Sequence, residues 1–311
     1  MAKCLFCYKE VKNTKNEYHN SCCKKFYGLN EIPVLSFTNK DIYKLAEQSV
    51  RKNMTITGVQ SKLSLGILKD KKNTSIRLTI LDLWGNYIFK PPVEIYAQMP
   101  EIEDLTMHLA SIYGINTVPH SLIRMASGEP AYISRRIDRL KKVKFHMEDM
   151  CQLTGRLTEY KYKGSIEEIS RIISQFSSNP GFDLISLFEI VLFSYLVGNA
   201  DMHLKNFSLI YKDDLIMLAP SYDLLSTKLL ISEEEDSALT MNGKKRNFTL
   251  NDFKIFAEYL EINSKSMENI FRKFSYNKVR ALEFISISFL TEENKRQLNS
   301  ITEDRYRRLN L

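Results

Sequence analysis

Residues 198–206 read Gly-Asn-Ala-Asp-Met-His-Leu-Lys-Asn, and this loop decides the fold. The preceding stretch, 184–197, is apolar almost all round, which predicts a buried helix. Two apolar runs at 207–211 and 215–218 follow, and Lys-Asp-Asp between them is turn chemistry, so they predict a β-hairpin. A polar loop framed by a buried helix and a hairpin is held in place on both sides.

Three oxygen-bearing side chains belong to this region. Asp201 and Asn206 are five residues apart in the loop, and Asp223 follows the hairpin in Ala-Pro-Ser-Tyr-Asp. Protein kinases separate a catalytic Asp from a Mg²⁺-binding Asn by the same interval and supply a second Mg²⁺-binding Asp later in the chain. The spacing predicts Asp201 as the general base and Asn206 and Asp223 as Mg²⁺ ligands. In the same loop, His203 is interpreted as a structural hydrogen-bonding residue and Lys205 as a cation for the phosphates.

Two upstream features complete a phosphoryl-transfer site in the expected order. The segment 55–63 offers a nucleotide-covering loop around Gly58, although a plain turn before a strand explains one glycine equally well. Lys90 ends an apolar strand, where it can project towards phosphates. Glu101 or Glu103, in the first turn of the next helix, can pair with it, although the helix dipole also favours acids there.

The order of elements predicts an α+β, bilobal fold, with a sheet-rich N-lobe over 1–133 and a mainly helical C-lobe over 134–311. Strands are predicted at 63–68, 75–81 and 87–90 as an antiparallel meander, and at 131–134. Helices are predicted at 41–51 (capped by Thr38 or Asn39), 101–113, 184–197 (capped by Asp183), 251–260, 267–274, 277–290 and, briefly, near 304.

Composition excludes several classes of protein. Hydrophobic residues make up 44% of the 311 residues and the net charge is +7, an ordinary globular mixture. The basic run at 135–144 is interpreted as a solvated face, so no nucleic-acid partner is expected. No stretch is read as a membrane span or as a secretory signal, and five cysteines in such a chain indicate a reducing cytoplasm.

Four of the five cysteines lie near the start of the sequence. Cys4, Cys7, His19 and either Cys22 or Cys23 are the residue types that hold tetrahedral Zn²⁺. Only one Cys-x-x-Cys pair is intact, so the sequence alone favours free thiols over a zinc site. A zinc-bearing nucleic-acid binder built on residues 1–28 remains an alternative.

Several of these motifs together resemble the HipA-like serine/threonine kinases of bacterial toxin–antitoxin systems. The resemblance is carried by the loop 198–207, Leu-Ala-Pro-Ser-Tyr-Asp at 218–223, Gly-Val-Gln-x-Lys at 58–62 and Tyr-Ile-Phe-Lys at 87–90. It extends to 133–139, the expected hinge, and to 148–152. In the hinge, Arg135 and Ile137 stand where HipA has an acid and an aromatic residue, so altered packing around a retained ATP site is expected.

The resemblance implies a set of nucleotide contacts and a mode of regulation. Lys90 would contact the ATP phosphates, and Gly58, Val59, Gln60 and Lys62 would form the covering loop. The family autophosphorylates a hydroxyl just before that loop, for which this sequence offers Thr55 and Thr57 where serines are usual.

The resemblance also implies partners and a substrate. The chain begins too late for the extra N-terminal subdomain of HipA, so it is more similar to the short HipT toxins. Those act with a HipS-like antitoxin and a HipB-like DNA-binding protein, and characterised relatives phosphorylate aminoacyl-tRNA synthetases. The alternative is a pseudokinase that binds ATP and acts through its partners.

Overall fold

The computed structural model describes residues 2–11, 17–42, 62–69, 76–81, 84–140 and 143–311. They divide into two compact units, the first made of 1–104 and 118–143 and the second of 105–117 and 144–311. Residues 134–143, predicted for the C-lobe, fall in unit 1, and residues 105–117, predicted for the N-lobe, fall in unit 2. The fold has mixed helices and sheets, as the α+β prediction requires.

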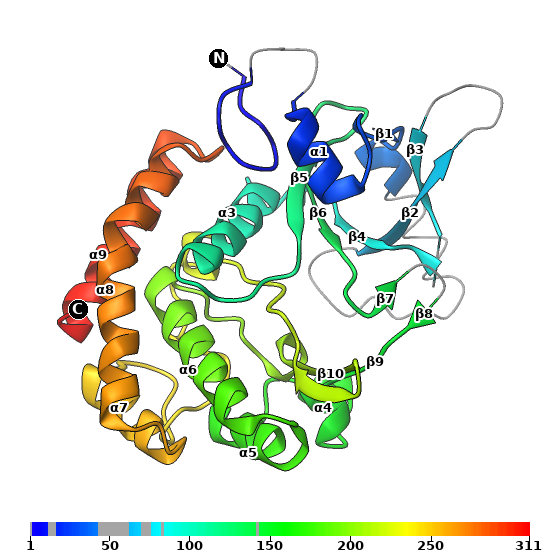
Figure 1. Ribbon diagram of the computed structural model, residues 1–311. Helices are drawn as coiled ribbons and strands as arrows, with labels where there is room; N and C mark the ends of the chain where they lie inside the picture. The colour runs from blue at the N-terminus through cyan, green and yellow to red at the C-terminus, as the bar shows by residue number, and fades with distance from the viewer. Residues whose placement is uncertain (1, 12–16, 43–61, 70–75, 82–83, 141–142) are drawn as a thin grey trace. The chain divides into compact units, whose positions relative to one another are not determined.

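Unit 1 is built on a six-stranded sheet (Figure 1) with the strand order β1-β3-β2-β4-β6-β5. Its strands are β1 (Val34–Leu35), β2 (Leu63–Lys69), β3 (Ile76–Ile80), β4 (Tyr87–Lys90), β5 (His120–Arg124) and β6 (Pro130–Arg135). β1 runs parallel to β3, and the other neighbours are antiparallel.

The predicted meander is wrong in its order, because β2 rather than β3 lies in the middle of the three strands. Leu65 is paired with Ile80 on one side and with Tyr87 on the other. Gly85 permits the crossing from β3 to β4: a Cβ there would lie 2.7 Å from the backbone N and O of Leu65. Only glycine allows the chain to approach that strand so closely.

The helix α3 (Met99–Ile112) begins in unit 1 and ends in unit 2, and Gly114 follows it at φ +80°, as predicted for a glycine after a helix. The predicted cap at Thr38 is also present, since its hydroxyl accepts from the Asp41 N–H (3.3 Å) and donates to the Asp41 carboxylate (2.6 Å). The other residues of that predicted helix, 43–51, lie outside the described residues. The sequence analysis did not identify β5, nor the helix α1 (Asn20–Tyr27).

Unit 2 surrounds the apolar helix α6 (Pro180–Val197), which begins four residues earlier than predicted. Asn179 is its N-cap and Pro180 its first residue, so the prediction of Asp183 as the cap is wrong. Asp183 instead accepts hydrogen bonds from the Ser177 hydroxyl (2.6 Å) and the Leu218 N–H (2.8 Å). By length and composition α6 would also pass for a membrane span, contrary to our reading of the sequence, but half of that span is buried inside the protein, as in a core helix.

The predicted hairpin is confirmed as β10 (Ser208–Lys212) and β11 (Leu215–Leu218), and both turn residues, Asp213 and Asp214, have positive φ. β9 (His146–Asp149), missed in the sequence, adds a third strand. The other short elements are β7 (Arg139–Leu140), β8 (Val143–Lys144), α4 (Met150–Leu153), α5 (Ile166–Phe176) and 3₁₀ turns at Thr158–Tyr160, Leu204–Asn206 and Thr227–Leu229.

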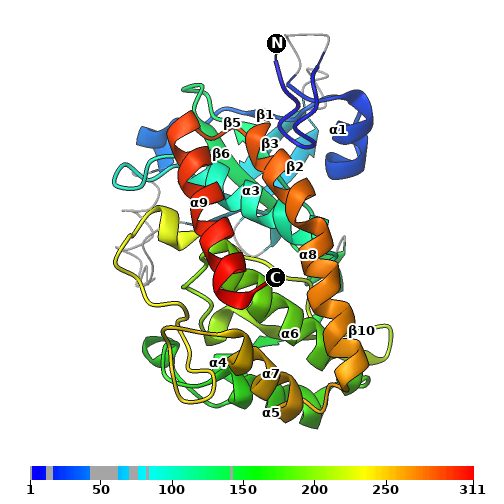
Figure 2. The same ribbon diagram turned by 90° about the vertical axis from the view of Figure 1, so that its left-hand side faces the viewer.

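The C-terminal part of unit 2 is helical, with α7 (Leu250–Tyr259), α8 (Ser264–Ser286) and α9 (Glu292–Leu309). Two corrections apply here. The helices predicted at 267–274 and 277–290 are one continuous helix, and the short helix predicted near 304 has 18 residues. Figure 2 shows α8 and α9 side by side. The Tyr306 hydroxyl of α9 donates to the Phe274 carbonyl of α8 (2.9 Å), which ties the two together.

Candidate active site

The predicted pair in unit 1 forms between Lys90 and Glu103. The Lys90 Nζ lies 2.5 Å from the Glu103 Oε1, and the two residues are only 4% and 1% exposed. Lys90 ends β4, and its ammonium lies 5.3 Å from the centroid of the Tyr132 ring on β6. A lysine at a strand end is normally solvent-facing, so its burial against a carboxylate and a ring marks a built site.

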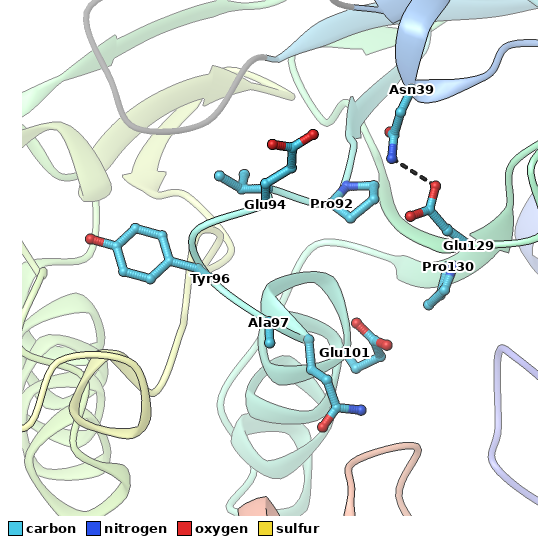
Figure 3. Close-up of a pocket in the computed structure, with 10 residues that line it drawn as sticks. Asn39, Pro92, Glu94, Tyr96, Ala97, Glu101, Glu129 and Pro130 are labelled. Atoms are coloured by element: carbon cyan, nitrogen blue, oxygen red, sulfur yellow. Dashed lines mark hydrogen bonds between the residues drawn. The ribbon is translucent and has the colours of Figure 1, made fainter.

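Glu101, the other candidate partner, contributes to a different place. It lines a pocket with Asn39, Glu129 and the segment 92–98, and Figure 3 shows Asn39 donating to Glu129 (2.7 Å). Burial raises the pKa of Glu101 to about 7. The N-terminal part of α3 therefore carries Glu103 for the lysine and Glu101, in the first turn, for this pocket.

In unit 2, the loop after α6 is anchored by a later segment. Gly198 ends the helix at φ +70°, and a Cβ there would lie 2.8 Å from the Lys228 Cβ. The Ser226 hydroxyl donates to the Val197 carbonyl (2.6 Å), and the Thr227 hydroxyl accepts from the Ala200 N–H (2.9 Å). Residues 226–228 thus fix the start of the loop before Asp201.

Asp201 and Asn206 are brought together within the loop. The Asn206 Nδ2 donates to the Asp201 carbonyl at 2.9 Å, so the amide oxygen is the end left for another ligand. The Asp201 side chain accepts a hydrogen bond from the Tyr162 hydroxyl at 2.9 Å. The amide and the carboxylate are therefore both held by hydrogen bonds within the protein.

His203 is buried beside these groups. Its ring meets the Tyr162 ring edge to face, with centroids 5.1 Å apart. Burial lowers the pKa of His203 to about 4, against the opposing effects of Asp201 and Asp223, which both lie near enough to act on its charge. The ring is therefore neutral at pH 7, and its Nδ1 has no hydrogen-bond partner among the described residues. The Nδ1 atom gives no support to the predicted hydrogen-bonding role of His203, which stays a prediction.

Asp223 lies at φ +56°, a left-handed conformation that a non-glycine residue adopts at some cost. The preceding residue ties this segment to the loop, since the Tyr222 hydroxyl lies 2.5 Å from the Ser208 hydroxyl and donates to the Lys205 carbonyl at 3.1 Å. The hairpin thus returns the chain to the loop, as the sequence predicts.

Lys205 is held by a carboxylate. Its Nζ lies 2.5 Å from the Asp149 Oδ2, and Asp149 caps α4. Its expected role towards phosphate remains a prediction, and that role would require this ion pair to open or to be shared.

Most of the expected nucleotide-covering loop falls outside the described residues. Thr55, Thr57, Gly58, Val59 and Gln60 lie outside the described residues. Lys62, the next candidate, is exposed at the start of β2.

Comparison with known proteins identifies the family of this chain. A family described as the HipA-like C-terminal domain matches residues 54–282. The chain belongs to this family. The matched range begins just before the expected covering loop and ends within α8.

Three proteins with known names are similar to this chain in sequence. "Putative kinase Y4dM" of Sinorhizobium fredii is 34% identical over 62% of this chain and 49% of its own length. A "putative kinase" of Haemophilus influenzae is 29% identical over 84% of this chain and 82% of its own length. The serine/threonine-protein kinase toxin HipA of Shewanella oneidensis is 26% identical over 61% of this chain and 47% of its own length. The chain thus spans about half the length of the Sinorhizobium relative.

Two solved structures share the fold. A complex of Shewanella oneidensis HipA with HipB and operator DNA superposes with a TM-score of 0.67 at 20% identity, over 89% of this chain and 72% of that one. The Helicobacter pylori proinflammatory kinase CtkA superposes with a TM-score of 0.56 at 15% identity, over 75% of this chain and 87% of that one. The HipA-like chain therefore has a protein-kinase-like fold.

Sequence reasoning missed the residues that hold the site in shape. Tyr162, Thr227 and Tyr222 each contact the loop through a hydroxyl, and they lie 39, 27 and 17 residues away in sequence from their partners in the loop. Tyr222 stood inside a quoted motif, so its proximity to Asp223 was a usable signal. No comparable signal marked Tyr162 or Thr227.

Proposed function

We propose that this chain is an ATP- and Mg²⁺-dependent serine/threonine protein kinase. The observation that carries the proposal is the fixed orientation of the Asn206 amide by the Asp201 carbonyl, at 2.9 Å. It leaves an amide oxygen in a loop that also offers the Asp201 carboxylate, with Asp223 close by. Amide and carboxylate oxygens suit Mg²⁺, which prefers hard oxygen ligands and retains its waters.

Each residue has a defined task in the proposed reaction. Asp201 accepts the proton of the attacking hydroxyl, and the Tyr162 hydrogen bond orients its carboxylate. Lys90 binds the ATP phosphates while Glu103 holds its ammonium. Asn206 and Asp223 would hold Mg²⁺, which when bound neutralises charge on the phosphates. His203, neutral at pH 7, adds no further charge to the loop.

We further propose the biological setting that the family suggests. The solved HipA complex contains HipB and operator DNA, which supports a HipB-like DNA-binding partner for this chain. A HipS-like antitoxin, membership of a HipBST-like toxin–antitoxin system and cytoplasmic action complete the proposal. The substrate would be an aminoacyl-tRNA synthetase, whose phosphorylation would inhibit translation.

Regulation by autophosphorylation is part of the same proposal. Thr55 and Thr57 are the candidate acceptors, just before the expected covering loop. A phosphate there adds nearly two negative charges beside those of the bound nucleotide, so repulsion would oppose ATP binding. Mass spectrometry of the labelled chain distinguishes the two threonines, and label found only elsewhere would remove this part of the proposal.

The decisive experiment is transfer of labelled γ-phosphate from ATP to the chain itself and to proteins of a cell extract, with and without Mg²⁺. Asp201→Asn keeps the size of the side chain and removes the base, so we expect a loss of about 10²-fold or more in rate. Asp213→Asn, in the exposed hairpin turn, is the matched control and should leave the rate unchanged. Wild-type protein that labels neither itself nor the extract would support the pseudokinase alternative instead.

A further inference from the structure

A second cluster of potential ligands lies in unit 1, apart from every residue assigned to phosphoryl transfer. It consists of Cys4, Cys7, His19 and Cys22, whose ligand atoms all lie within 4.8 Å of one another. Cys4 is buried and the other three are half-buried. The residues come from a short N-terminal turn and from the start of α1, where His19 is the N-cap.

The spacing of these atoms matches a single metal ion. The His19 Nδ1 lies 3.4 Å from the Cys7 Sγ and 3.7 Å from the Cys22 Sγ. With Zn–S near 2.3 Å and Zn–N near 2.0 Å, a tetrahedral ion separates sulfur from nitrogen by about 3.6 Å. A disulfide or one hydrogen bond would bring only two of these atoms together, whereas here three sulfur atoms and one imidazole nitrogen lie close to one another.

The orientation of His19 is an independent sign of a ligand. Its other ring nitrogen, Nε2, donates a hydrogen bond to the Glu10 carbonyl at 2.9 Å. That bond fixes the tautomer, so that Nδ1 carries its lone pair towards the sulfur atoms. Metal-binding histidines are held in the same way, by a backbone carbonyl or a carboxylate on the far nitrogen.

The backbone of the first pair forms a tight turn. The Tyr8 N–H donates to the Cys4 carbonyl (2.9 Å) and the Cys4 N–H to the Lys9 carbonyl (2.8 Å). Tyr8, directly after Cys7, lies at φ +63°. This turn directs Cys4 and Cys7 to one side, where His19 and the first turn of α1 supply the remaining ligands.

We propose that Cys4, Cys7, His19 and Cys22 bind one structural Zn²⁺ ion. Four protein ligands fill a tetrahedral shell and leave no open position, which is typical of structural rather than catalytic zinc. Cys23 lies outside the cluster, so the structure selects Cys22 from the two candidates that the sequence left open. Thiolates would favour Zn²⁺ over Mg²⁺, so this site is chemically distinct from the phosphoryl-transfer site.

The ion would fasten the N-terminal segment to the rest of unit 1. The Leu122 N–H of β5 donates to the Leu5 carbonyl (3.3 Å), and the Tyr8 hydroxyl donates to the Asp104 carboxylate of α3 (2.8 Å). Leu5 and Tyr8 are both 2% exposed. A metal ion held by residues from both ends of this short segment would crosslink it and so add to the order that these contacts provide.

The test measures the zinc content of the purified full-length chain under reducing conditions by inductively coupled plasma mass spectrometry. We expect about one zinc per chain, lost in Cys22→Ser, with Cys23→Ser as the matched control that retains it. Wild-type protein with less than about half an equivalent, or equal loss from the two variants, would overturn the proposal.

A second measurement needs no variant and does not depend on kinase activity. Alkylation of the native wild-type chain, followed by peptide mass spectrometry, should show Cys4, Cys7 and Cys22 protected until a chelator is added. Exchange of the zinc for Co²⁺ should give the visible bands of tetrahedral thiolate-bound cobalt. Cysteines that react equally with and without chelator would contradict the site, whatever the outcome of the phosphate-transfer experiment.

Discussion

The buried ion pair of Lys90 and Glu103 allows stability and catalysis to be separated in one set of variants. Lys90→Met keeps most of the aliphatic stem and removes the ammonium, and Glu103→Leu removes the carboxylate. The double variant removes both charges. Because the residues are 4% and 1% exposed, each single variant leaves one charge buried without this partner.

The magnitudes follow from that burial. Removing one member of a buried pair typically costs about 3–5 kcal/mol in the free energy of unfolding, whereas replacing both with apolar side chains is often near neutral. The double variant also loses the interaction of Lys90 with the Tyr132 ring, 5.3 Å away, worth about 1–2 kcal/mol. We therefore expect the double variant to be more stable than either single variant.

The assays are urea unfolding followed by far-UV circular dichroism and phosphate transfer from labelled ATP. Stability should recover in the double variant, but phosphate transfer should be lost in all three, since none retains both the ammonium and its carboxylate. A double variant destabilised by the sum of the two single effects would show that the charges do not act as a pair. Phosphate transfer by the double variant would refute the role of Lys90 on the phosphates.

Three further predictions concern other positions. Tyr162→Phe should lower kcat by about tenfold, because it removes one hydrogen bond that orients Asp201, and it should leave the KM for ATP unchanged. An unchanged kcat in steady-state kinetics would count against the role of Tyr162 on Asp201. Burial raises the pKa of Glu101 to about 7, above its unfolded value, so wild type should lose stability as the pH rises from 4.5 to 7. This loss in the free energy of unfolding, up to about 3 kcal/mol, should be absent in Glu101→Gln when urea unfolding is measured across that pH range. The same pH dependence of stability in wild type and variant would refute the prediction. Gly198→Ala should cost about 1–3 kcal/mol more than Gly128→Ala, because both have positive φ but only the first Cβ meets other atoms; equal melting temperatures would contradict the clash.

The parts of the site that sequence reasoning predicted are those set by local spacing. Asp201, Asn206 and the hairpin before Asp223 occupy one continuous stretch, in which loop length alone limits the geometry. Lys90 and Glu103 are separated by 13 residues, and the periodicity of the helix decides which of two acids faces the lysine. The structure selects Glu103 because Glu101 lies on the side of α3 that lines the pocket in Figure 3.

The parts that sequence reasoning missed depend on the long-range pairing of segments. The position of β2 between β3 and β4 depends on a close approach at Gly85, which nothing in the local alternation of residues reveals. The start of α6 was placed at Asp183 because an acid before an apolar run is a common cap. Asn179 followed by Pro180 was an equally good signal for the start of the helix. Asp183 instead accepts hydrogen bonds from the Ser177 hydroxyl and the Leu218 N–H.

The two proposals for unit 1 meet on a single helix. Asp104, the residue after Glu103 on α3, accepts hydrogen bonds from the Tyr8 hydroxyl at 2.8 Å and from the His120 Nδ1 at 2.7 Å. Tyr8 directly follows Cys7 of the proposed zinc site, so the metal-fastened segment bonds the same helical turn that presents Glu103 to Lys90. Adjacent residues on a helix point about 100° apart, and one turn can therefore serve both contacts without competition. The zinc-binding segment would then support the position of Glu103, the acid that holds Lys90, for which we propose the role of binding phosphate.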